Sequence, residues 1–349
     1  MRLSRVLSCA VTAVLAATTL AGTADAGPAH ARTIPAHVFA PYFQAYLPDD
    51  PGELAAASGA RYLTMGFLHT NKPGECEPYW NGVPQTPVAE SSYGAGITRI
   101  KAMGGDIIPA LGGAYAGELG LDLADSCTDV DAIAAGFQKL VTTYDISRID
   151  LDVEGASLDN AAGIDRRNKA IRKTQEWAAA NGRIVEFVYT LGTSPTTGVI
   201  SPGVTILRNA IANGAEVRMV NIMTFDYYDD KQHDMFEDAR TAAQATVDTL
   251  RGLYPAKTSA QLWNMVGITE MVGLDDYGSN GETGPPEVFT ETNAIKLTIW
   301  GWLKGVGQLS FWALARDNGK CPGQHQEDCS GVQQAPWQYT KTMKAFTHR

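Results

Sequence analysis

The sequence lacks the patterns that several common classes of binding site require. Its 349 residues carry a net charge of −10 at pH 7 and no run of Lys or Arg, which disfavours a nucleic-acid partner. No G-x-G-x-x-G follows the first β-like run, so a dinucleotide-binding site is not expected. There is no C-x-x-C pair and the six His residues are scattered, so we expect neither a metal site nor another cofactor.

Beyond the amino-terminal segment, no apolar run approaches the length needed to span a membrane. Residues 1–26 contain Arg2 and Arg5, then an apolar run, then Ala24 and Ala26 on either side of Asp25. This order predicts a secretory signal peptide that is cleaved near Ala26. A membrane anchor is the alternative, but the run is short and interrupted by Thr and Gly. We expect a secreted, extracellular protein with no membrane partner.

Cysteine is scarce, and its count fits an oxidising compartment. One of the five Cys residues, Cys9, lies in the predicted signal peptide, which leaves an even number. Four cysteines allow three pairings, and disulfides are expected in a secreted chain. We favour Cys76 with Cys127 and Cys321 with Cys329, because the second pair closes one short loop.

Short β-branched or aromatic runs recur at intervals that leave room for a helix between them. Amphipathic helical patterns occupy residues 129–144, 165–182 and 237–254. Eight alternating units predict an α/β fold, a (β/α)8 TIM barrel, with an open doubly wound sheet as the alternative. No linker interrupts the pattern, so we expect one domain over residues 33–349. The eight predicted strands are 37–43, 61–69, 106–113, 148–155, 184–192, 219–228, 264–273 and 307–317.

The fourth predicted strand, RIDLDVEG, carries an acid at every second position. Asp150, Asp152 and Glu154 therefore share one face of the strand, and three apolar residues share the other. In an antiparallel sheet such a face would simply meet water. In a barrel both faces are covered, and buried carboxylates are costly unless they are paired. The acids are thus expected to form a catalytic column at the carboxyl-end mouth of the barrel.

The motif IDLDVEG resembles the D-x-D-x-E core of glycoside hydrolase family 18, which includes chitinases and endo-β-N-acetylglucosaminidases. Three other strands carry similar family motifs, and the resemblance covers nearly all of the chain after the signal peptide. ALGG at 110–113 is similar to the S-x-G-G turn, VNIMTFDYY at 220–228 to the M-x-Y-D strand, and LSFWALARD at 309–317 to the closing Trp strand.

The resemblance implies a chitinase that cleaves β-1,4 N-acetylglucosamine links by a retaining, substrate-assisted mechanism. The predicted signal peptide adds secretion, and the short segment 273–307 adds endo-type cleavage as a hypothesis. Glu154 would be the general acid/base, and Asp152 would bind the acetamido N–H and stabilise the oxazolinium ion. Asp150 would share a proton with Asp152, since close carboxylates resist joint ionisation. The partners would be chitin or N-acetylglucosamine oligosaccharides, bound by a monomer.

Further site residues follow from the same resemblance. Trp312 would form the hydrophobic floor beneath the sugar at the cleavage subsite. Asp226 and Tyr227 would bind the acetamido group, and Met223 would pack nearby. Tyr42, on the first strand, is better explained as a core residue.

The sequence departs from the family pattern at four positions in three motifs. Ser147 and Arg148 stand where the strand-four motif has Asp and Gly, Ala110 replaces the S-x-G-G serine, and Phe225 replaces the strand-six tyrosine. These changes remove an acid and hydroxyl groups, and Tyr227 is the candidate substitute for the lost tyrosine.

Two alternative functions are an endo-β-N-acetylglucosaminidase acting on N-glycans and a non-catalytic chitin-binding lectin. The core acids do not separate the first from a chitinase, and retention of Glu154 argues against the second. Residues 273–307 are too few for a large insertion between strands seven and eight, which predicts an open groove.

Overall fold

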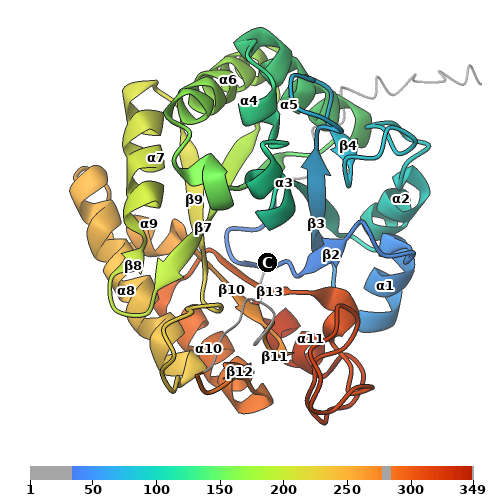
Figure 1. Ribbon diagram of the computed structural model, residues 1–349, viewed down its shortest axis with the longest axis vertical. Coiled ribbons are helices and arrows are strands. Elements are labelled where there is room, and N and C mark those ends of the chain that lie inside the picture. Colours follow the sequence, from blue (N-terminus) through green and yellow to red (C-terminus); the bar gives the residue numbers. More distant parts are fainter. Residues whose placement is uncertain (1–33, 277–283, 348–349) are drawn as a thin grey trace, which may run out of the picture. The chain divides into compact units, whose positions relative to one another are not determined.

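A closed, parallel sheet forms the centre of the fold in the computed structural model, which describes residues 34–276 and 284–347 (Figure 1). Each strand of the barrel pairs in parallel with the next. The first predicted strand is divided into two short strands, β1 and β2. β1 pairs with the last barrel strand, β13, and β2 pairs with the second, β3, so the sheet closes on itself. In spatial order the strands are β1 (Val38–Phe39), β13 (Gln308–Trp312), β10 (Val266–Met271), β9 (Val217–Met223), β7 (Glu186–Ser194), β6 (Arg148–Asp152), β5 (Asp106–Gly112), β3 (Tyr62–His69) and β2 (Tyr42–Gln44).

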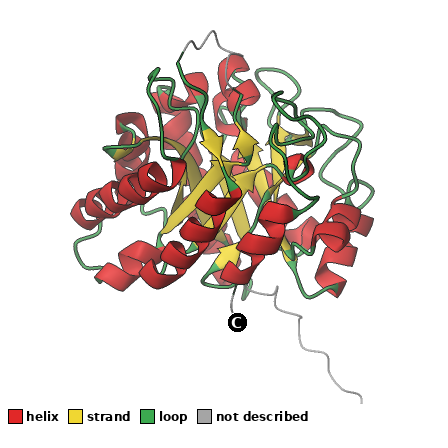
Figure 2. Cartoon of the chain, turned by 90° about the horizontal axis from the view of Figure 1, so that it is seen from below, coloured by secondary structure: helices red, strands yellow, loops and turns green. Residues whose placement is uncertain are grey.

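Helices surround the strands, as the view from the side shows (Figure 2). The three helical patterns found in the sequence become α5, α6 and α8, and Asp129 caps α5 by accepting from the backbone N–H groups of Asp131 and Ala132. The (β/α)8 barrel prediction is confirmed. The helices are α1 (Pro51–Ser58), α2 (Gly94–Ala102), α3 (Ala114–Leu119), α4 (Leu123–Ser126), α5 (Val130–Tyr144), α6 (Ala161–Ala180), α7 (Ser201–Ala212), α8 (Met235–Leu253), α9 (Ser259–Asn264), α10 (Glu291–Lys304) and α11 (Gln338–Met343).

Four short strands are added to the barrel outside its parallel sheet. β4 (Tyr79–Trp80) and β8 (Gly198–Val199) extend β3 and β7 as antiparallel strands. Between the seventh and eighth barrel strands, the described residues hold only the two-stranded sheet of β11 (Gly273–Leu274) and β12 (Val288–Phe289), followed by α10. The prediction that no large insertion separates these two strands is confirmed.

The hydrophobic core of the described residues consists of one large cluster and two small ones. Most buried apolar side chains lie in one large cluster that includes the helix faces turned towards the strands. A small cluster of Ile34, Val38, Ala40, Tyr62 and Ile108 lies near the amino ends of the first strands. The other small cluster, of Tyr42, Ala110 and Ala313, has Phe67 and Trp312 packed against it and lies towards the carboxyl ends of the strands.

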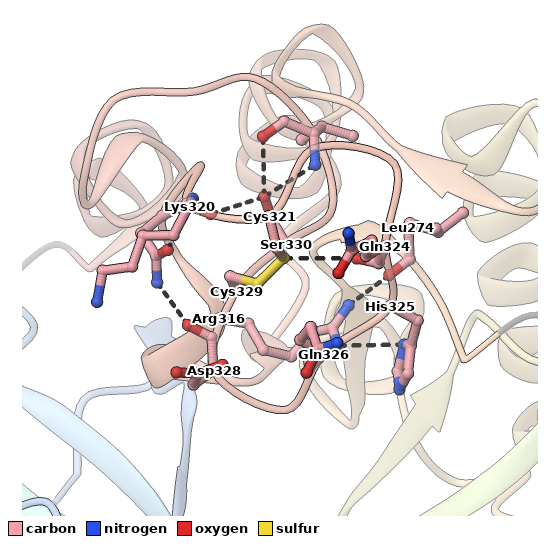
Figure 3. The surroundings of a disulfide bond; sticks show 12 residues. Leu274, Arg316, Lys320, Cys321, Gln324, His325, Gln326, Asp328, Cys329 and Ser330 are labelled. Atoms are coloured by element: carbon pink, nitrogen blue, oxygen red, sulfur yellow. Dashed lines mark hydrogen bonds between the residues drawn. A yellow bond between two sulfur atoms is a disulfide. The ribbon is translucent and has the colours of Figure 1, made fainter.

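Both predicted disulfides are present. Cys76 bonds to Cys127 and Cys321 bonds to Cys329. The loop closed by the second bond is held by Arg316, which donates to the carbonyl oxygens of Gln326, at 2.6 Å, and of Leu274 (Figure 3). The disulfide closes this loop, and the partly buried hydrogen bonds of Arg316 attach it to the barrel.

Three predicted strands end earlier than expected, and the predicted signal peptide cannot be compared with the structure. The strands predicted over 148–155, 219–228 and 307–317 end at Asp152, Met223 and Trp312, so they are shorter than predicted. The predicted signal peptide, residues 1–26, lies outside the described residues. Within the described ranges, no helix is both long and apolar enough to cross a membrane.

Candidate active site

The three acids of the motif lie at the carboxyl end of β6. Asp150 and Asp152 are buried in the strand, and Glu154 follows it, half-buried, at the start of the 3-10 helix η1 (Gly155–Leu158). Gly112 of β5 pairs with Asp152 and has a φ of +102°, and a Cβ there would lie 2.0 Å from the Asp152 carbonyl oxygen. Only glycine fits this close approach, which brings β5 against the acids.

Both carboxylate oxygens of Asp150 accept hydrogen bonds. The Tyr42 hydroxyl donates to Oδ2 at 2.7 Å and the Thr190 hydroxyl donates to Oδ1 at 2.8 Å. Burial raises the pKa of Asp150 to about 6, and the two hydroxyl bonds oppose that rise. Asn221 in turn donates to Thr190 at 3.0 Å. Asp150 is therefore the acid of the column whose ionised form is best supported.

Asp152 has the opposite environment. It is buried, and its Oδ1 has no hydrogen-bond partner among the residues that the structure describes. Burial, followed by the charges of Glu154 and Asp150, raises its pKa well above the usual range of Asp. Among the acids of the column, Asp152 is therefore the one whose environment most favours the protonated form, and Asp150 and Glu154 lie on either side of it along the strand.

Glu154 forms part of the wall of a pocket of about 250 Å³ that Met223, Asp226 and Tyr228 also line. Burial raises the pKa of Glu154 to about 7, a backbone contact with Ala114 opposes the rise, and the charges of two further acids add to it. A carboxyl group with this pKa at a pocket wall can both give and take a proton near neutral pH.

Asp226 lies on the loop after β9, in the left-handed region with a φ of +53°. Burial, a hydrogen bond with Asp276 and the charges of nearby acids raise its pKa to about 10. Its Oδ1 has no partner among the described residues. Asp226 is therefore protonated at neutral pH and presents a carboxyl group to the same pocket as Glu154.

The structure does not bring Tyr227 into that pocket. Its ring packs on His233, with 4.9 Å between the ring centroids, and its backbone N–H donates to Glu287 at 2.9 Å. The next residue, Tyr228, lines the pocket instead. The reason is that β9 ends at Met223, so strand alternation does not set the directions of the loop side chains.

Trp312 lies at the end of β13, half-buried among aromatic rings. It stacks on Phe67, with 5.6 Å between ring centroids and an interplanar angle of 11°, and its centroid is 5.6 Å from that of Tyr42. It therefore sits on the Tyr42 side of Asp150 and is not part of the 250 Å³ pocket wall.

Several residues at the site were not predicted from the sequence. Tyr42, which we placed in the core, is bonded to Asp150, and Thr190 and Asn221 extend the network from neighbouring strands. Phe67 and Tyr228 were also missed. No single sequence signal marks these residues, because Thr190 and Asn221 lie inside β7 and β9, Phe67 lies near the end of β3 and Tyr228 lies in the loop after β9.

The described part of the chain contains no group of three or more His, Cys, Asp or Glu residues placed to hold a metal ion.

The fold and the site define a class of protein: a (β/α)8 barrel with a column of acids at its carboxyl-end mouth. A search against protein-family models found no match. The chain is 30% identical over 296 residues both to a probable bifunctional chitinase/lysozyme of Escherichia coli and to endochitinase 11 of Metarhizium anisopliae. The match covers 81% of this chain but only 31% and 53% of these relatives, so the chain spans a third to half of their length.

Solved structures of chitinases are also similar to this chain. The catalytic domain of a hyperthermophilic chitinase from Pyrococcus furiosus is 27% identical, with a TM-score of 0.78 over 92% of this chain and 97% of that one. A GH18 chitinase from Pseudoalteromonas aurantia, 13% identical with a TM-score of 0.54 over 81% of this chain and 96% of that one, shares the fold. The predicted resemblance to chitinases is confirmed by these relatives, and the chain has the fold of a GH18 chitinase.

Proposed function

We propose that the protein is a secreted, endo-acting chitinase that hydrolyses β-1,4 N-acetylglucosamine links with retention of configuration. The observation that carries this proposal is the position of Glu154, an acid with a pKa of about 7 in a pocket wall, directly above two buried acids. The similarity to chitinases supports the substrate class.

In the proposed mechanism each of the three acids has a separate role. Glu154 donates its proton to the leaving glycosidic oxygen, and the acetamido oxygen of the substrate is the nucleophile. Asp152 accepts a hydrogen bond from the acetamido N–H and stabilises the positive charge that develops on the oxazolinium ring. Asp150, whose carboxylate accepts hydrogen bonds from Tyr42 and Thr190, is the ionised member of the buried acid pair. Glu154 then activates the water that opens the oxazolinium ion.

The surrounding side chains hold the sugar. Trp312 supplies an aromatic floor for the C–H face of the pyranose ring. Asp226 offers Oδ1, which has no partner among the described residues, to the acetamido group, with Met223 and Tyr228 on the same pocket wall. In this assignment Tyr228 takes the place that Tyr227 had in the sequence-based prediction.

The cellular setting remains part of the proposal. Residues 1–26 direct secretion, and residues 33–349 form the catalytic barrel, which acts as a monomer. The two disulfides agree with an oxidising compartment. The short connection between β10 and β13 leaves the groove open, which favours cleavage inside a long chitin chain.

Incubation of the mature protein with chitohexaose and with an N-glycosylated protein tests the function. We expect mass spectrometry to show internal cleavage of chitohexaose, and proton NMR to show that the first product has the β-anomeric configuration. Release of N-glycans alone would replace the chitinase by an endo-β-N-acetylglucosaminidase. Binding of the oligosaccharide without any cleavage would replace it by a lectin.

The pKa values predict a narrow pH profile. Asp150 must be ionised, which requires a pH above about 6, and Glu154 must be protonated, which requires a pH below about 7. We therefore expect kcat/KM on chito-oligosaccharides to rise as the pH increases through 6 and to fall as it passes 7. Initial rates across the pH range measure this. A plateau that extends far above pH 7 would contradict the assignment of Glu154.

A further inference from the structure

A buried cation lies at the base of the acid column. Arg148 is the first residue of β6, and its side chain is only 1% exposed. Side chains two residues apart on a strand share a face, so Arg148 is on the same face as Asp150 and Asp152. Arg148 occupies the position where the family motif has a glycine, which carries no charge.

The charge of Arg148 is only partly neutralised. Its Nε and Nη2 donate to Oε2 of Glu186 at 2.8 and 2.6 Å, across the register of β6 and β7. The other oxygen of Glu186 lies 3.2 Å from Nε of Arg218. Arg218 otherwise donates to Asn264, through a backbone and a side-chain oxygen. Two guanidinium groups thus share one carboxylate, and one positive charge remains in excess.

One nitrogen of the Arg148 guanidinium makes no hydrogen bond to the described residues. This nitrogen, Nη1, is buried. Glu186 is 29% exposed, so water screens that partner more than it screens the arginine. The next acid along the same face is Asp150. Burial is the largest influence on the pKa of both groups, but the charge of Arg148 lowers the pKa of Asp150, and the charge of Asp150 raises the pKa of Arg148.

The groups around Asp150 supply no other positive charge. The contacts of Asp150 come from Tyr42 on β2 and Thr190 on β7, which are neutral hydroxyl groups, and Asp152 on its own strand is an acid. Burial raises the pKa of Tyr42 well above its usual value, so it stays neutral. The guanidinium below is therefore the countercharge of the column.

We propose that Arg148 is a positioning residue whose excess charge keeps Asp150 ionised, so that the single proton of the buried acid pair stays on Asp152. This inference rests on the proposed function, because it gives the proton to the acid that would meet the acetamido group. A purely structural role, in which Arg148 only ties β6 to β7 through Glu186, is the competing explanation.

Three variants separate the two roles. Arg148→Met removes the charge, Arg148→Lys retains it, and Glu186→Gln removes the shared carboxylate so that both arginines lose their compensation. We expect Arg148→Met to move the acidic limb of kcat/KM upward by about one pH unit. Arg148→Lys should leave the limb near that of the wild type, and Glu186→Gln should move it downward. A structural role predicts lower stability in all three variants with no shift of the limb.

A direct titration keeps this test independent of the proposed function. NMR of protein with ¹³C-labelled Asp carboxyl groups, with the Asp150 signal assigned through Asp150→Asn, follows the ionisation of Asp150 without any substrate. If the wild-type protein cleaves no oligosaccharide, the chitinase proposal is wrong. The titration would still test whether Arg148 controls the ionisation of Asp150. An unchanged Asp150 midpoint in folded Arg148→Met overturns the inference. If Arg148→Met does not fold, an unchanged midpoint in Glu186→Gln overturns it equally.

Discussion

Replacement of Glu154 by glutamine is expected to lower kcat for chito-oligosaccharide hydrolysis by about 10²- to 10⁴-fold. The amide keeps the size of the side chain, so the pocket that Met223 and Asp226 also line should keep its shape. It cannot give or take the proton, and the two remaining acids of the column are buried beneath it. Substrate binding should therefore survive while the chemical step is lost.

A neighbouring acid provides the matched control. Glu118 on α3 is exposed, and its charge is one of the influences that raise the pKa of Glu154. Glu118→Gln should change kcat only a few-fold and shift the alkaline limb of the pH profile slightly downward. Rates measured by product mass, with affinities from calorimetry, give both quantities. A Glu154→Gln enzyme that retains a tenth or more of the wild-type kcat would remove Glu154 from the role of proton donor.

Loss of the Cys76–Cys127 disulfide is expected to cost about 4 kcal/mol of unfolding free energy, from the entropy of a closed loop of this length. The two cysteines are 51 residues apart in sequence, whereas Cys321 and Cys329 are 8 apart. Since the entropy that a cross-link removes from the unfolded chain grows with loop length, the shorter bridge should contribute less, about 2.5 kcal/mol.

The double variants Cys76→Ser/Cys127→Ser and Cys321→Ser/Cys329→Ser test this order by equilibrium unfolding in urea. Each serves as the control for the other, because both remove one bridge and add two hydroxyl groups. The second loop also holds Glu327, which accepts hydrogen bonds from Tyr46 and Gln44 at the barrel mouth, at 2.6 and 3.0 Å. Equal losses in the two variants, or a larger loss from the shorter loop, would show that native contacts outweigh the loop entropy.

Much of the fold followed from patterns that are local in the sequence. Each barrel strand is a short run of β-branched and aromatic residues, and its length and spacing predict a βα repeat without knowledge of its partners. The cysteine pairing was suggested by one short loop, and both bonds are present. The shared face of Asp150 and Asp152 needed only the two-residue period of a strand.

The ends of the strands were harder to predict, and the site depends on them. The family motif at 220–228 suggested one continuous strand, but β9 stops at Met223 and Asp226 adopts a left-handed conformation. Beyond that point a two-residue period no longer applies. For this reason Tyr228 lines the pocket and Tyr227 packs against His233.

The sequence by itself determined the barrel, the acidic face of its fourth strand and the two disulfides, because each depends on residues close together in the chain or on a regular period. Only the tertiary structure decided which groups control those acids. Tyr42 meets Asp150 across 108 residues, and Arg148 meets Glu186 across 38. Such pairs arise when parallel strands close into a barrel in one particular register, and no local pattern in the chain encodes that register.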